Sequence, residues 1–152
     1  MLTQICHHIH NYFERSRHEG EYTIAGGTIT LDFLTVGQRF RILGSAANDG
    51  IYTYHAAGTI WDDDNSKAVI LVNETFTGAI IDMGVPREVI ELAGEIAAWV
   101  TANAQALNSP FTSESFGGYS YQKASGGAGG TGGVFSWKDM FRDRLNAYRK
   151  IA

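Results

Sequence analysis

The sequence predicts an α+β fold in which N-terminal, central and C-terminal helices form a small bundle, with an inserted antiparallel β-sheet or barrel module and a long glycine-rich arm. Three observations lead to this prediction. Apolar residues recur at helical spacing in three segments, residues 21–83 alternate with a period of two, and residues 104–136 combine glycine and serine with aromatic side chains. The length of 152 residues is typical of one domain, and we expect residues 1–152 to form it.

The N-terminal helix is expected over residues 1–19. Its apolar side chains recur three or four positions apart, which places them on one helical face, and they are Leu2, Ile5, Ile9, Tyr12 and Phe13. Gly20 follows and is expected to end the helix.

The β module is expected over residues 21–83, where turn signals separate short alternating segments. Phe40 and Ile42 are the apolar positions of one such segment and should face the core. The sequence Asn48-Asp49-Gly50 is one of the strongest short-range signals for a hairpin turn. A small antiparallel sheet and a small barrel both fit this pattern. The expected strands cover residues 22–24, 28–31, 38–43, 51–55, 59–61, 68–72 and 75–81.

Two further helices are expected. Pro86 is favoured in the first turn of a helix, and it predicts a central helix over residues 86–103. The apolar stripe of that helix comprises Val89, Leu92, Ala93, Ile96, Trp99 and Val100. A C-terminal helix is expected over residues 137–151, with one face formed by Trp137, Met140, Phe141, Leu145, Tyr148 and Ile151.

Residues 104–136 form the predicted arm. Six of the eight residues from 126 to 133 are glycine, a composition typical of flexible linkers. The arm also carries aromatic residues, which dock against a partner at little cost in side-chain entropy; they are Phe111, Phe116, Tyr119, Tyr121 and Phe135. Two alternatives stay open, because such an arm reaches a neighbouring subunit or folds back over its own sheet.

Charge and cysteine content exclude several classes of protein. Twelve basic against sixteen acidic residues give a net charge of −4, which argues against a dedicated duplex-DNA-binding domain. The single cysteine, Cys6, excludes an intramolecular disulfide. No segment approaches the ~18 apolar residues of a membrane span, and the first residues lack the pattern of a signal peptide. We therefore expect synthesis in a reducing cytoplasm and no membrane partner.

No cofactor is expected. Residues 127–132 match the glycine pattern of a dinucleotide-binding loop, but no predicted strand precedes them and the chain ends before an acidic partner. No metal is expected either. His7 and His10 have a spacing that suits metal ligands on a helix, yet Cys6 and Glu14 do not complete a convincing set.

Two weaker chemical patterns also favour a structural interpretation. Residues 62–66 resemble the start of a calcium-binding loop, but Lys67 and Asn73 stand where that loop needs a glycine and a bidentate acid. Cys6 has His10 one helical turn away, which is too little to identify a nucleophile and its base. The chain is therefore not expected to be an enzyme, and no residue is assigned a catalytic role.

Several motifs follow one another along most of the chain. They are residues 37–54 with the turn Asn48-Asp49-Gly50-Ile51-Tyr52, residues 73–78, the Val85-Pro86 helix start with Ile96 and Trp99, residues 113–121, and the terminal series Trp137, Phe141, Leu145-Asn146 and Tyr148-Arg149. This ordered series resembles the small neck proteins of tailed bacteriophages and prophages, of the head–tail connector or adaptor type.

The resemblance implies a structural role in the virion. A connector joins the portal ring of the filled capsid to the next neck or tail protein, typically as a twelve-fold ring around the DNA channel. The implied partners are the portal protein, the adjacent neck or tail protein and further copies of this chain, while DNA passes without sequence-specific binding. The implied location is the virion neck, after synthesis in the bacterial host cytoplasm.

On this basis we assign three surfaces by hypothesis. Docking onto the portal is assigned to Trp137, Phe141, Tyr148, Arg149 and Lys150. Contact with the adjacent subunit is assigned to Phe111, Phe116, Tyr119 and Tyr121 in the arm, and contact with the tail-side partner or the channel to Asn48, Asp49 and Gly50. Truncation after Asn108 is expected to leave a soluble fold that no longer attaches to portals.

Other functions remain open at this point. A stopper or tail-completion protein would share the same motifs. A β-barrel module that binds a small ligand or peptide, with the arm as its lid, is the second alternative. A phage-encoded hydrolase that uses Cys6 or a histidine is the weakest.

Overall fold

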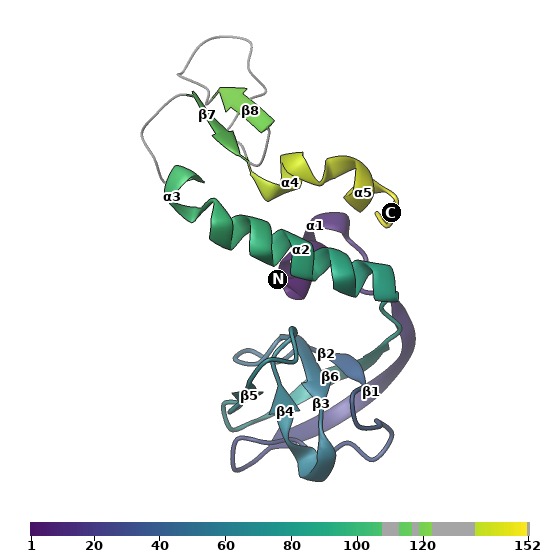
Figure 1. The fold of residues 1–152 in the computed structure, drawn as a ribbon. Helices are drawn as coiled ribbons and strands as arrows, with labels where there is room; N and C mark the ends of the chain where they lie inside the picture. The colour runs from purple at the N-terminus through teal and green to yellow at the C-terminus, as the bar shows by residue number, and fades with distance from the viewer. Residues whose placement is uncertain (108–112, 117–118, 123–135, 152) are drawn as a thin grey trace.

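A computed structural model describes residues 1–107, 113–116, 119–122 and 136–151. Its helices and strands, in chain order, are α1 (Leu2–Ile9), β1 (Glu14–Ile24), β2 (Arg39–Leu43), β3 (Gly50–Tyr54), the 3-10 turn η1 (Ala56–Gly58), β4 (Ile60–Trp61), β5 (Ala68–Val69), β6 (Glu74–Met83), α2 (Arg87–Ala102), α3 (Ala104–Leu107), β7 (Ser113–Phe116), β8 (Tyr119–Gln122), α4 (Trp137–Met140) and α5 (Arg142–Asn146). The mixture of helices with an antiparallel sheet confirms the predicted α+β class (Figure 1).

The first six strands form one antiparallel sheet in the order β1-β6-β2-β3-β4-β5. The long strands β1 and β6 pair along nearly their whole length, from Glu14 opposite Met83 to Ile24 opposite Glu74. The ladder is that of an open sheet. Beyond its last strand, Leu71 N donates a hydrogen bond of 2.9 Å to Gly27 O in the turn that follows β1.

The prediction of a helix over residues 1–19 is wrong beyond its first half. Helix α1 ends at Ile9, because His10 adopts the left-handed conformation with φ of 53°. Asn11 N then donates to Cys6 O, and residues from Glu14 onward pair with β6. Tyr12 still packs against the same core cluster as the helix, although it lies in the turn.

Several predicted elements have the expected place but different bounds. The segment 28–31 contributes only a bridge between Ala25 and Thr28, and the strand expected over 68–72 is limited to β5. The expected C-terminal helix is divided into α4 and α5 at Phe141, whose φ is −105°. The predicted arm includes the short helix α3 and the β7–β8 hairpin, so it is not wholly extended.

Other predictions are confirmed at the level of single residues. Phe40 and Ile42 in β2 are fully buried. Pro86 directly precedes α2, and the buried face of that helix comprises Val89, Leu92, Ala93 and Ile96. The turn of residues 62–66 joins β4 to β5, as the acidic composition predicts.

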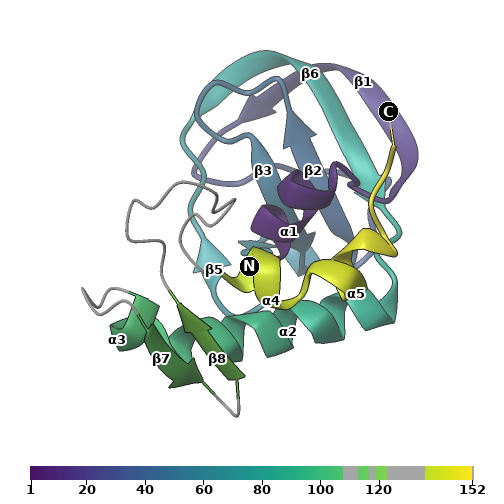
Figure 2. The same ribbon diagram turned by 90° about the horizontal axis from the view of Figure 1, so that it is seen from above.

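The core consists of two clusters of buried side chains. One lies between the helices and the sheet, and it unites Ile5 and Ile9 of α1 with Leu92 of α2 and with Ile81 and Met83 of β6. The other lies within the sheet module and is built from Ile24, Ile29, Leu31, Leu34, Phe40, Ile42, Tyr54, Ile60, Leu71, Phe76 and Ile80. Figures 1 and 2 show the helices gathered on one side of the six-stranded sheet. No helix in the described ranges is long and apolar enough to cross a membrane.

Candidate functional site

The aromatic residues assigned to portal docking pack within the chain. Trp137, Phe141 and Tyr148 are half-buried against the core cluster between helices and sheet. The Phe141 ring lies edge-on to Trp99 with ring centroids 6.2 Å apart, and the Trp137 ring lies edge-on to His8 at 5.6 Å. These rings therefore hold the C-terminal segment onto α1 and α2, and a partner meets only their remaining exposed parts.

The polar members of that set differ from each other. Arg149 donates from Nη1 to His8 O at 3.0 Å, and its Nη2 lies 3.2 Å from His8 Nε2. Burial, together with Arg149 and Lys138, lowers the pKa of His8, so its ring is neutral and accepts from Arg149 at neutral pH. Lys150 uses its backbone N–H to bind Ile9 O, and its side chain is exposed. Only Lys150 of the five assigned residues is therefore fully available to a partner.

The C-terminal segment also contributes to the core. Leu145 in α5 is 1% exposed and lies in the cluster between helices and sheet. Truncation after Asn108 would remove this side chain from the core, so we now expect the truncated protein to be destabilised.

The loop before β3 does not present Asn48 to a partner, which corrects its assignment. Asn48 is 3% exposed, and its side chain joins the loop to the chain before β6. Its Nδ2 donates to Val72 O at 2.9 Å and to Glu74 at 2.8 Å, while its Oδ1 accepts from Val72 N at 2.8 Å. Asp49 is the exposed member of the assigned set and lies 3.4 Å from Arg41, and Gly50 begins β3.

The assigned arm residues are only partly described. Phe116, Tyr119 and Tyr121 belong to the β7–β8 hairpin, in which Phe116 pairs with Tyr119 and Glu114 with Tyr121. Phe111 lies outside the described residues, as do Phe135 and the glycine-rich segment 126–133. Figure 1 shows the hairpin beside α3, with the helices between it and the six-stranded sheet. In the described part, the hairpin therefore does not cover that sheet.

The weaker chemical candidates occupy structural positions. Cys6 is fully buried, and burial raises the pKa of its thiol to about 12, so it is not a thiolate at neutral pH. Asp62 accepts hydrogen bonds from Ser66 N at 2.8 Å and Ser66 Oγ at 2.9 Å, which stabilises the turn. Among the residues that the structure describes, no three His, Cys, Asp or Glu side chains are grouped to hold a metal ion. The segment 127–132 lies outside them.

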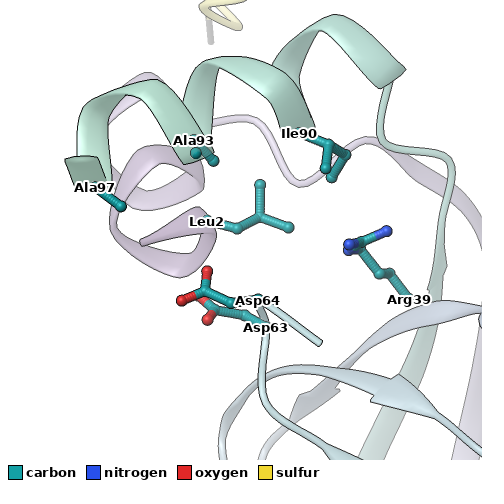
Figure 3. A pocket seen from close by; sticks show the side chains of 8 residues that line it. Leu2, Arg39, Asp63, Asp64, Ile90, Ala93 and Ala97 are labelled. Atoms are coloured by element: carbon teal, nitrogen blue, oxygen red, sulfur yellow. The ribbon is translucent and has the colours of Figure 1, made fainter. Parts of the chain in front are cut away.

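A cavity of about 380 Å³ lies between α1, α2 and the sheet module (Figure 3). Arg39 lies on one side, Asp63 and Asp64 lie on another, and Leu2 lies between them beneath α2. The complete lining is Leu2, Arg39, Asp63, Asp64, Ile90, Ala93, Gly94 and Ala97. Sequence reasoning missed this site because these residues come from four separate segments and form no motif.

Asp63 fixes the start of α1 to the turn between β4 and β5. Its Oδ2 accepts from both the N–H and the hydroxyl of Thr3, each at 2.7 Å, and lies 3.4 Å from the Met1 ammonium. Burial alone would raise the pKa of this carboxyl, but these donors outweigh burial and hold the pKa below its ordinary value of 3.8. The charged form of Asp63 therefore stabilises the folded state.

We predict that Asp63→Asn lowers the free energy of unfolding by about 1.5 kcal/mol at pH 7, since a charge-assisted hydrogen bond contributes about that much. Because the folded pKa is lowered, the contribution of Asp63 is complete above its unfolded pKa and is lost as pH falls through the folded value. Urea denaturation between pH 7 and pH 2 should show the two proteins converging in acid. Asp32→Asn, at an exposed carboxyl, is the control. A difference that stays constant with pH would contradict the prediction.

No protein-family model matches the chain, and neither does any curated protein or solved structure.

Proposed function

We propose that this chain is a virion structural protein of the head–tail connector type, which joins the portal ring to the next neck or tail protein around the DNA channel. The observation that carries the proposal is the β7–β8 hairpin. It lies on the far side of the helices from the six-stranded sheet (Figure 1), and its two strands pair with each other. This position of the hairpin supports a contact with a second copy of the chain.

A contact between the hairpin of one copy and a different surface of the next is heterologous, and heterologous contacts close into a ring when the rotation between copies permits. Among the described residues, β7 and β8 pair with no other strand, and a neighbouring strand would extend this two-stranded sheet by pairing with one of its edges. The resemblance implies twelve copies in such a ring. A net charge of −4 fits a channel that DNA crosses, because tight phosphate binding needs clustered Lys and Arg.

In this proposal, the helices α1, α2, α4 and α5 act as one bundle that faces the portal. The contact is made by the exposed side chains of Lys138, Arg142 and Lys150, since the aromatic side chains of the same segment pack against the core of their own chain. The sheet module faces the tail side, where Asp49 is the exposed residue of the assigned loop. A stopper or tail-completion role remains the closest alternative, and the binding module with the arm as lid is the next.

The test uses a phage or prophage that encodes this chain and from which its gene has been deleted. Electron microscopy should show DNA-filled or leaking heads separated from finished tails, and the purified wild-type protein should restore joining. A variant that lacks residues 113–122 should keep its thermal midpoint within a few degrees, because residues 1–107 and 136–151 supply the six-stranded sheet and the helices beside it, yet fail to restore joining. Glu19→Ala, at an exposed site on the edge strand β1, is the control that should restore it.

The outcomes separate the parts of the proposal. Intact, infectious particles without the gene would remove the connector function and favour the binding module. Joining restored by the protein without its hairpin would keep the neck function but remove the contact between subunits through residues 113–122.

A further inference from the structure

We propose that the cavity beside Arg39 binds a carboxylate carried on a short aliphatic chain. Hexanoate has this chemistry as a free acid, and the carboxy-terminal leucine of a peptide has it as part of a protein. The inference does not rest on the connector function. It rests on the shape of the cavity, on the buried Nε of Arg39, which has no hydrogen-bond partner among the described residues, and on the charged residues that line the cavity.

The cavity has an apolar side and two charged ends. Leu2 and the α2 residues Ile90 and Ala93 provide the apolar surface, and Arg39 lies at one end of it (Figure 3). Binding sites for small molecules generally occupy about 300–1,000 Å³ and combine an apolar lining with a few polar groups. A volume of about 380 Å³ lies at the small end of that range, which suits a short chain rather than a large cofactor.

Arg39 has a hydrogen-bond donor that the described part of the chain does not use. Its Nε is buried and has no hydrogen-bond partner among the described residues. Leaving a buried charged donor unpaired is costly, so such a group needs an explanation, and a ligand that completes its hydrogen bonding supplies one. The planar guanidinium presents parallel N–H groups that match the two oxygens of a carboxylate.

A second cavity adds positive charge on the same side of the molecule. It has a volume of about 300 Å³ and is lined by Arg39 together with Arg15, and none of its lining residues is acidic. The stem of Arg15 lies against Gly84, in space that a Cβ on that glycine would occupy. Two arginines therefore line one small cavity whose lining contains no carboxylate, in a protein whose net charge is −4.

The acidic end of the first cavity fixes the orientation of the ligand. Asp63 and Asp64 both contact the Met1 ammonium, and Asp63 also binds Thr3. Their charge repels a ligand carboxylate, whereas Arg39 attracts it. The carboxylate therefore lies at Arg39, and the aliphatic chain extends along Leu2 and Ala93.

The first experiment compares three probes of equal length, namely hexanoate, hexylammonium and hexanol. The Nε–Hε resonance of Arg39 in ¹⁵N-labelled protein reports on the site directly. Hexanoate should shift this resonance saturably with a Kd on the order of 1 mM, as expected for a ligand of this size. The other two probes should bind at least about tenfold more weakly, because neither carries a negatively charged group that forms an ion pair with a guanidinium. Equal binding of hexylammonium would overturn the proposal.

Variants then separate the roles of charge and shape, with hexanoate binding followed by calorimetry. Arg39→Met keeps an unbranched apolar stem but removes the guanidinium, and it should weaken binding about tenfold or more. Ala97→Leu should weaken it by occupying the cavity while leaving Arg39 in place. Arg87→Met removes an arginine that is 88% exposed and should leave binding unchanged.

A stability measurement tests whether the role of Arg39 is purely structural. Because Nε has no hydrogen-bond partner among the described residues, Arg39→Met should be at least as thermally stable as the wild-type protein. Unchanged hexanoate binding by this variant, or a thermal midpoint well below that of the wild type, would overturn the assignment.

Two further probes distinguish the sources of the carboxylate. Acetyl-alanyl-leucine with a free carboxy terminus represents a protein segment, and its amidated form lacks the charge. Tighter binding of the free peptide than of hexanoate identifies a peptide terminus as the preferred source, and the reverse order identifies a free acid. Either order supports the site, whereas equal binding of the amidated peptide and the free peptide would overturn it.

Discussion

Replacing Gly78 with alanine is expected to destabilise the protein by about 3 kcal/mol or more, the upper part of the range for overpacked sites. Gly78 lies in β6, where the chain leaving β2 approaches it closely. A Cβ at this position would overlap the carbonyl oxygen of Leu43 and lie 3.1 Å from its carbonyl carbon and 3.2 Å from Gly44 Cα. These are backbone atoms, so the clash is relieved only by moving β2 away from β6 and disturbing the ladder beside Leu43.

Gly20 provides a matched control for this variant. It lies directly opposite Gly78 in the β1–β6 ladder, yet a Cβ on Gly20 would meet no atom within 4 Å. Gly20→Ala should therefore leave the free energy of unfolding within about 0.5 kcal/mol of the wild type. Urea denaturation of both variants measures the difference. For a domain of this size, the expected loss for Gly78→Ala corresponds to a fall of about 6–12 °C in thermal midpoint. Equal stability of the two variants would show that β2 shifts freely, contrary to the structure.

The elements that the sequence predicts well are those that local patterns determine. In β2, alternation places Phe40 and Ile42 on one face, and both are buried because a strand exposes every second side chain to the same side. Helix α2 begins next to Pro86, which cannot donate the hydrogen bond that a helix interior requires. Neither feature depends on a distant part of the chain.

The region after Ile9 shows why other elements were missed. Tyr12 and Phe13 continue the helical spacing of α1, and both pack against the same core, so the pattern is real. However, His10 and Phe13 have φ values of 53° and 50°, and the side chain of Asn11 accepts a hydrogen bond from Phe13 N. The chain then pairs with β6, about sixty residues away in the sequence. Long-range backbone pairing determines the conformation of this segment, and local periodicity carries no information about that pairing.

The interaction surfaces were predicted less well, for a related reason. A sequence motif does not reveal whether an aromatic or polar side chain binds a partner or its own chain. Asn48 belongs to a recognisable turn, but its amide is used internally by Val72 and Glu74. No sequence pattern predicts the cavity beside Arg39, since Leu2, Arg39 and Asp63 become neighbours only when the sheet packs against the helices.

Replacing Leu145 with alanine is expected to lower the free energy of unfolding by about 3 kcal/mol, within the range for deleting most of a buried leucine side chain. Leu145 is 1% exposed and belongs to the same cluster as Ile9 of α1 and Ile96 of α2. Because α5 has only five residues, packing rather than helix propensity must hold it in place. The variant should therefore release the terminal segment, and hydrogen exchange of its amides should become faster than in the wild type.

Ile151→Ala is the control, since Ile151 is 91% exposed and its loss should change stability by no more than about 0.5 kcal/mol. The Leu145→Ala variant also tests the portal contact. If the terminal segment docks onto the portal as a surface of the folded protein, Leu145→Ala weakens docking in proportion to the unfolding of that segment. Lys150→Ala, at an exposed side chain, should weaken docking without changing stability. Portal binding by Leu145→Ala at wild-type strength would mean that the segment binds as an unfolded peptide, and the packing described above would then be irrelevant to attachment.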